Sequence, residues 1–249
     1  MAGHSHSANI ARRKNAVDAK RAKIFSKCAK AILSAVKQGG PDVDKNLKLK
    51  YAIEGARSSN MPKDNIIRAI KSASGDKSGD MEDLVYEGYG SGGVAMMVTA
   101  LTDNRNRSAA DLKFIFDKRG GNMGAQGSVA FTFDFRSILV VETGDLNEEQ
   151  LMELALEAGA DDVDIGEGGA TFYGDPTEFL SIKTVLEEKG LDFVQAEVGY
   201  VPQTTVVVDS KEDAKRILQL IDDLEDHDDV QKVYSNFEIP DEWLDELAG

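Results

Sequence analysis

The chain changes character near residue 79, and this change limits the folds that it can adopt. Residues 1–78 hold 17 Lys and Arg against 6 Asp and Glu, whereas the remaining 171 residues hold 12 against 38. The first part places apolar residues at helical spacing, and the second alternates strand patterns with helix patterns. The polar stretch SASGDKSGD between them has the composition of a linker. The sequence therefore predicts an α+β, multidomain fold whose N-terminal domain is basic and helical.

The basic part is expected to be a three-helix bundle over residues 19–73. Phe25, Cys28, Ile32 and Val36 recur at helical spacing before Gly39-Gly40-Pro41 ends the run. A second amphipathic helix follows around Leu49–Ala56, and Pro62 begins a third. The aromatic residues Phe25 and Tyr51 both sit at the spacing of the bundle core.

The acidic part is expected to hold two ferredoxin-like βαββαβ domains, one inserted in the other. Residues 136–202 contain a complete set of strands and helices in this order. The flanking stretches supply two βαβ units, with strands expected at 94–101, 129–135, 204–208 and 230–234. The predicted domains are residues 1–78, residues 79–135 plus 203–240, and the insert at 136–202.

The positive charge of residues 1–78 points to a polyanion, because a nucleic-acid backbone offsets the repulsion among clustered cations. Lys20, Lys23, Lys27, Lys30 and Lys37 fall opposite the apolar stripe of the first helix. An ordinary solvated helix face is the alternative for this strip. The candidates for phosphate contact in the basic part are Arg12, Arg13, Lys14, Lys20, Arg21, Lys23, Lys27, Lys30 and Lys63. No residue set indicates base readout, so recognition of backbone and shape is expected, in DNA or in RNA.

A second candidate phosphate contact lies in the sequence TDNRNRS, where a strand passes into a helix. Arg105 and Arg107 are the cations, and Ser108 is the expected N-cap of the helix. The alternative is a polar loop whose arginines pair with nearby acids.

Two glycine-rich stretches need a structural account. The sequence GYGSGG at 88–93 precedes a strand, whereas nucleotide-binding loops follow one, so a turn with positive φ is the better interpretation. Glycines at 120, 121, 124 and 127 are interpreted as a flexible connection into the next strand.

No catalytic constellation is found, and the protein is expected not to be an enzyme. One cysteine, Cys28, excludes an internal disulfide, and no apolar run reaches the length of a membrane helix. Acidic clusters at 161–164 and 222–229 lack the spacing of a calcium loop, so they are interpreted as solvated acids and not as metal ligands. We expect a cytoplasmic protein with no cofactor, no metal, no small-molecule substrate and no membrane partner.

Several long phrases of the sequence resemble the YebC/PmpR family. They are MAGHSxxANIxxRK at the start, NMPKDNIxRAI, TDNRNRS, GGNMGxxGSVAFxF and LEDxDDVQxVYxNFEIP near the end. The chain departs from the usual start of the family, HSKWANI, because His6 and Ser7 replace a lysine and a tryptophan. This removes one cation and one stacking aromatic from the N-terminus.

The resemblance implies a helical domain followed by two α/β domains, and a DNA-binding transcriptional regulator without a cofactor. Some family members resemble translation factors instead, so the alternative function is a ribosome-associated factor that binds rRNA or tRNA. A second alternative is a protein adaptor that uses the lysine face on an acidic partner.

Overall fold

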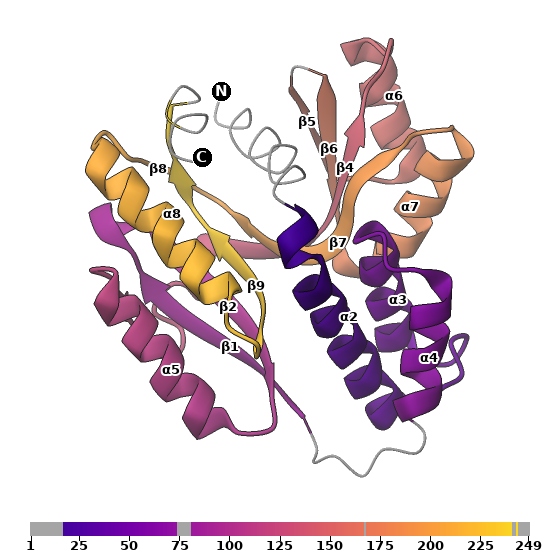
Figure 1. Ribbon diagram of the computed structural model, residues 1–249. Coiled ribbons are helices and arrows are strands. Elements are labelled where there is room, and N and C mark those ends of the chain that lie inside the picture. The colour runs from indigo at the N-terminus through magenta and orange to yellow at the C-terminus, as the bar shows by residue number, and fades with distance from the viewer. Residues whose placement is uncertain (1–16, 74–80, 167, 241–242, 244–249) are drawn as a thin grey trace. The chain divides into compact units, whose positions relative to one another are not determined.

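The computed structural model describes residues 17–73, 81–166, 168–240 and 243. The chain divides into two compact units, each built from two stretches. The first unit holds residues up to 74 and residues 135–199, and the second holds residues 75–134 and those from 200 onward. Helices and antiparallel sheet pairings are present, so the predicted α+β, multidomain class is confirmed (Figure 1).

Three packed helices form the N-terminal part of the first unit. They are α2 (Val17–Gly39), α3 (Leu47–Ser58) and α4 (Lys63–Ala73). Their apolar faces meet in one core that includes Ile32, Leu49, Ile53 and Ile66. The predicted three-helix bundle is therefore present.

Asn46 fixes the turn between α2 and α3. Its Oδ1 accepts a hydrogen bond from the backbone N–H of Leu49 at 3.0 Å and so caps α3. Its Nδ2 donates to the carbonyl oxygens of Ala35 and Gly40, both at 2.8 Å. Ala35 lies near the end of α2, and Gly40 follows its last residue. One buried amide thus closes two helix ends.

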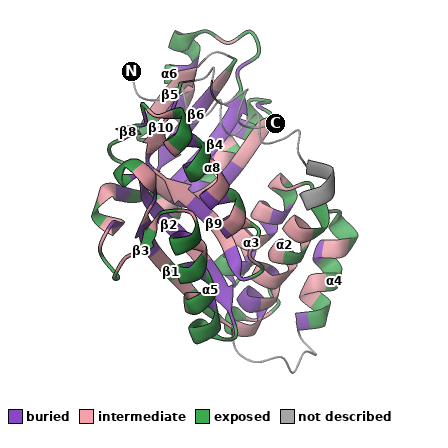
Figure 2. Ribbon diagram, turned by 60° about the vertical axis from the view of Figure 1, so that its left-hand side comes forward, coloured by how far each residue is buried: buried purple, intermediate pink, exposed green. Residues whose placement is uncertain are grey.

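Residues 133–202 add a four-stranded sheet with two helices. The elements are β4 (Phe133–Glu142), α6 (Glu148–Ala158), β5 (Asp162–Gly166), β6 (Gly169–Gly174), α7 (Phe179–Glu188) and β7 (Phe193–Pro202). The spatial order of the strands is β5-β6-β4-β7, with the first strand and the third in the middle. Both helices pack on one face, in a core that contains Leu139, Phe172 and Ile182. The central strands β4 and β6 are largely buried, whereas most residues of the edge strands β5 and β7 are half-buried (Figure 2).

The spacing of Tyr51 predicted a place in the core of the bundle. The structure places Tyr51 against the core of the α/β part instead. Its ring packs edge-on against Phe179 with 5.5 Å between centroids, and its hydroxyl donates to the carbonyl oxygen of Pro176 at 3.0 Å. The carboxylate of Glu54 lies 3.3 Å from the ammonium of Lys183. The reason is that α3 has a second contact face, which packs on the α/β part of the same unit.

The second unit is built on another antiparallel sheet. Its strands are β1 (Glu82–Tyr89), β2 (Ala95–Thr102), β3 (Asn122–Met123) and β9 (Val230–Ser235), in the order β3-β1-β2-β9. Helices α5 (Arg105–Lys118) and α8 (Lys211–Glu225) cover one face. They bury Leu112, Phe116 and Ile217 against Met96 and Val98 of β2.

This sheet corrects the prediction of a second βαββαβ domain. The strand β1 was missed, and it occupies the position that β6, the third strand, has in the other sheet. Of the expected strand 129–135, residues 130–132 form a 3₁₀ turn and β4 begins at Phe133. Of the expected strand 204–208, Val206–Val207 form β8, which pairs in parallel with β10 (Phe237–Glu238) outside the main sheet.

The glycines at 88–93 form the turn of a hairpin, as expected. Gly92 and Gly93 have φ values of 68° and 77° in the short 3₁₀ turn Ser91–Gly93 between β1 and β2. These values lie in the left-handed region, which glycine adopts without the steric cost of a Cβ.

Candidate nucleic-acid interface

Helix α2 carries part of the predicted lysine strip, but its lysines are less exposed than the pattern indicated. Lys23, Lys27 and Lys30 are half-buried and Arg21 is exposed, and all four take part in interactions. Long lysine side chains can lie along a neighbouring surface while the ammonium stays near water. Arg12, Arg13 and Lys14 lie outside the described residues, as does the side chain of Lys20.

Besides Arg21, the exposed cations that the structure describes in the bundle are on and around α3 and α4. The exposed residues are Lys45, Lys48, Arg57, Lys63, Arg68 and Lys71. Lys63, one of the predicted contacts, is the first residue of α4. Lys45 also pairs with Asp42, but such an exposed pair contributes little and exchanges readily with other anions. Arg57 pairs with Glu54, whose carboxylate is mostly covered and also pairs with Lys183.

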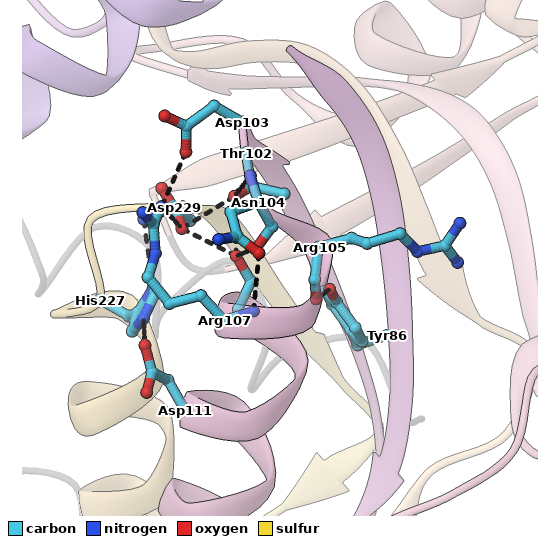
Figure 3. A network of polar contacts seen from close by, with 10 residues as sticks. Tyr86, Thr102, Asp103, Asn104, Arg105, Arg107, Asp111, His227 and Asp229 are labelled. Carbon is cyan, nitrogen blue, oxygen red and sulfur yellow. Dashed lines mark hydrogen bonds and ion pairs between the residues drawn. The ribbon is translucent and has the colours of Figure 1, made fainter. Parts of the chain in front are cut away.

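Arg105 and Arg107, the other predicted contacts, have different surroundings at the start of α5 (Figure 3). Arg105 points away from the polar network of the figure, and its guanidinium lies 3.9 Å from Glu82. Arg107 donates from Nη2 to Asp103 and to Asp229, both at 2.9 Å. Arg107 is therefore paired with acids, as the alternative interpretation expected, whereas Arg105 is more accessible.

Asp229 is the centre of this network and is only 3 % exposed. Besides Arg107, its Oδ2 accepts hydrogen bonds from the hydroxyls of Thr102 and Ser108, at 3.0 and 2.8 Å. The N-cap of α5 is Asn104, whose Oδ1 accepts from the N–H of Arg107, so the expected cap at Ser108 is wrong. Ser108 is buried, and its hydroxyl lies within hydrogen-bonding distance of the Thr102 hydroxyl and the Asp229 carboxylate.

Two acids of the 222–229 cluster have structural partners, contrary to the expectation of a solvated group. Asp229 is buried, and Asp223 accepts from the guanidinium Nε of Arg119 at 2.8 Å. This hydrogen bond outweighs the effect of burial and lowers the pKa of Asp223. Asp222, Asp226 and Asp228 are exposed.

A second buried carboxylate, Glu87 of β1, holds the glycine-rich loop between β3 and β4. Its Oε1 accepts from the N–H of Gly127 at 2.6 Å, and its Oε2 accepts from the N–H groups of Val129 and Ala130 at 2.7 and 2.9 Å. The hydroxyl of Tyr89 donates to the carbonyl oxygen of Ser128 at 2.7 Å. The N–H of Gly124 also donates to the backbone carbonyl of Glu87. Residues of β1 therefore bind five backbone groups of the loop, and the expectation of a flexible connection is wrong.

The segment just before β3 also approaches the sheet closely. A Cβ at Gly121 would lie 2.5 Å from the carbonyl oxygen of Tyr89, so this position requires glycine. Glu87 and Asp229 were not among the predicted site residues, although Glu87 directly follows the short apolar run Leu84-Val85-Tyr86. That pattern is the one sequence signal that could have found it.

Comparisons with known proteins bear on the same regions. The model described as the TACO1/YebC protein N-terminal domain matches residues 5–76, and the model of the TACO1/YebC second and third domain matches residues 81–237. The chain belongs to the YebC/PmpR family. The basic bundle is thus the N-terminal domain of the family, and both buried carboxylates lie within the region of the second model.

Relatives match over the full length. A "probable transcriptional regulatory protein" of Halothermothrix orenii is 48% identical and covers 100% of this chain and 99% of its own. A protein of the same name from Dictyoglomus turgidum is also 48% identical, with 100% of both chains covered. The crystal structure of a conserved hypothetical protein from Aquifex aeolicus has a TM-score of 0.80 at 42% identity, covering 90% of this chain and 93% of the other. The names support a regulator at the level of the family.

The relatives are named as regulatory proteins and not as enzymes. Within the part of the chain that the structure describes, no helix combines the length and the apolar composition needed to cross a membrane.

Replacing Asp229 should destabilise the second unit. In Asp229→Ala, the hydroxyls of Thr102 and Ser108 lose a buried acceptor and Arg107 loses its buried partner, so we expect a loss of about 2–4 kcal/mol in the free energy of unfolding. Urea denaturation followed by circular dichroism measures it. Asp103→Ala removes the exposed partner of the same arginine and should cost less than about 0.5 kcal/mol. Equal losses in the two variants would contradict the central role of Asp229.

Stability should depend on pH through Glu87. Burial disfavours its ionised form, but the three N–H donors outweigh burial and lower the pKa of Glu87. A lowered folded-state pKa stabilises the protein above the unfolded pKa, and this contribution is lost as pH falls through the folded pKa. The difference in unfolding free energy between the wild type and Glu87→Gln should therefore be largest at neutral pH and shrink as the pH falls below the ordinary pKa of a glutamate, about 4.3.

Urea titrations at several pH values test this, with the exposed Glu153→Gln as the matched control. A difference for Glu87→Gln that grows on acidification would refute the assignment.

Proposed function

We propose that this protein is a nucleic-acid-binding regulator of gene expression that acts in the cytoplasm as a DNA-binding transcriptional regulator. The observation that carries the proposal is the charge of the bundle. Residues 17–73 hold 13 Lys and Arg against 5 Asp and Glu, in a chain whose net charge is −15. The names of the relatives support the transcriptional role.

The bundle suits contact with phosphates more than with base edges. Exposed cations line its helices. On α4, for example, Lys63 is followed by Arg68 and Lys71. Lysines and arginines at such positions neutralise backbone phosphates without reading the sequence. The proposed contacts are Lys63 together with Arg21, Lys23, Lys27 and Lys30 of α2, and with Arg12, Arg13, Lys14 and Lys20 before them.

Arg105 is the proposed contact in the second unit. Its guanidinium is exposed and its nearest acid, Glu82, is itself exposed, so a phosphate can replace that weak pair. Arg107 is assigned a supporting role, since its bonds to Asp229 and Asp103 fix the first turn of α5 from which Arg105 projects. The acids elsewhere in the chain repel phosphate and limit where a polyanion can bind.

The second candidate is a ribosome-associated translation factor that binds rRNA or tRNA. It is favoured by the same observation, because recognition of backbone and shape serves RNA as well as DNA. Crosslinking in cells, with sequencing of both the DNA and the RNA recovered, separates the two. Discrete promoter DNA would support the transcriptional regulator, and a predominance of ribosomal RNA or tRNA would replace it with the translation factor. If neither DNA nor RNA is recovered, the remaining alternative is the protein adaptor.

Neutralising three cations of α4 should change the salt dependence of binding. For the triple variant Lys63→Gln, Arg68→Gln and Lys71→Gln, we expect the slope of log K against log salt on duplex DNA to become shallower by about 2 to 3. Each lost phosphate contact removes the release of about one counterion. Fluorescence anisotropy over a range of salt concentrations measures the slope.

The matched control removes the same charge from α8, by Lys211→Gln, Lys215→Gln and Arg216→Gln. This control should leave the slope unchanged, and both variants should keep the unfolding midpoint because the replaced side chains are exposed. A slope near zero for the wild type, or equal changes in the two variants, would refute phosphate contact by the bundle.

A further inference from the structure

Phe131 is the most unusual side chain of the glycine-rich loop. It lies in the 3₁₀ turn Ala130–Thr132 and is 70 % exposed, although Val129 and Phe133, two positions away on each side, are buried. Burying a phenylalanine side chain contributes about 1.5–3 kcal/mol, so a loop free to rearrange would bury this ring. An apolar ring that stays in water at a fixed place needs an explanation.

The fixed position of Phe131 follows from the bonds on both sides of it. The carboxylate of Glu87 holds the N–H groups of Gly127, Val129 and Ala130 before the ring. After the ring, the carbonyl oxygen of Thr132 accepts from the N–H of Gln203 at 2.9 Å. The loop therefore holds the backbone at Phe131 in one conformation, so binding to the ring would require little further ordering of the loop.

Val129 and Phe133, which flank the same turn, are buried in the protein. Both pack in a small core with Ala95 and Met97 of β2 and with the rings of Tyr89 and Tyr234. Val129 and Phe133, two positions before and after Phe131, are thus packed in this core, whereas the Phe131 side chain remains exposed.

The chemistry of the loop limits what can bind there. Residues 120–133, GGNMGAQGSVAFTF, contain no Asp, Glu, Lys or Arg, in a chain of which 29% is charged. The carboxylate of Glu87 beneath the loop is covered by its three N–H donors. A polyanion thus meets less repulsion here than at the acidic surfaces of residues 79–249. An exposed aromatic ring in uncharged surroundings is what stacking on a nucleic-acid base requires, and it offers no partner for a phosphate.

We propose that Phe131 is a stacking platform for an unpaired base of a single-stranded nucleic acid. The inference rests on the proposed function and deepens it, because it assigns a base contact to a protein whose other proposed contacts bind phosphates. Bases in a duplex are already stacked on each other, so single strands, loops and bulges are the substrates that fit. Stacking tolerates any base, which agrees with a loop that has no charged group to read one.

The test uses the full chain and fluorescence anisotropy with three probes of one mixed sequence: single-stranded RNA, single-stranded DNA and the duplex. Phe131→Ala should weaken binding to the single strands by about tenfold and change duplex binding by less than about twofold. Phe131→Leu should lose as much as alanine, because it keeps apolar area without a π face. Phe131→Tyr should bind like the wild type.

Phe114 supplies the matched control. It is 67 % exposed, but it lies within the regular helix α5, next to Lys113, which pairs with Asp117. Phe114→Ala should bind all three probes like the wild type. Thermal unfolding of each variant checks the fold, which the loss of an exposed ring should not weaken.

The outcomes separate this inference from the function on which it rests. If the wild type binds none of the probes, the proposed function fails and the stacking role fails with it. If the wild type binds the single strands and Phe131→Ala binds them equally well, only the stacking role is overturned. Full binding by Phe131→Leu would overturn it too, since an apolar contact of the kind made with a protein would then suffice.

Discussion

The hairpin of β1 and β2 is the element on which the second unit depends. Its strands pair without interruption from Glu82 opposite Thr102 to Tyr89 opposite Ala95. On one face, β2 supplies Met96 and Val98 to the core under α5 and α8. Glu87 and Tyr89 of β1 hold the glycine-rich loop, and Thr102 at the end of β2 joins the network of Asp229. Both the start of α5 and the position of Phe131 are therefore set by one antiparallel ladder.

Two buried carboxylates in this acidic protein act as structural acceptors. Removing a carboxylate from water is costly, and each site offsets the cost with three hydrogen-bond donors. Glu87 uses backbone N–H groups of a single loop, whereas Asp229 joins two hydroxyls and an arginine from segments more than a hundred residues away in sequence. One carboxylate thus orders a local turn, and the other connects distant parts of the chain.

Local pattern was sufficient to predict much of the fold. The three helices of the bundle and the strand expected at 230–234 agree with the structure, because the apolar spacing of each segment matches the period of one element. The strand β1 was missed because Glu82, Asp83 and Glu87 break up its apolar alternation. Glu87 is buried there, a fact that depends on N–H donors forty residues further along.

The candidate site was less predictable than the fold. Arg105 and Arg107 look alike in the sequence, and what distinguishes them is Asp229, 122 residues from Arg107. The acids around Asp229 look equally solvated until the turn before β9 brings that one carboxylate beneath α5. For the lysines of α2, helical spacing correctly identified the packed face but did not show how far the other side chains are covered.

The pairing of β2 with β9 has a consequence for synthesis of the chain. Met96 pairs with Ser235, so the sheet of the second unit waits for residues made some 140 positions later, whereas the first unit is complete by residue 199. During translation, β2 therefore presents an open edge while the rest of the chain emerges, and an open edge is a template for pairing with another chain. The second unit is therefore the last to receive all its strands. The nascent β1–β2 hairpin is the element that a chaperone would protect during this time.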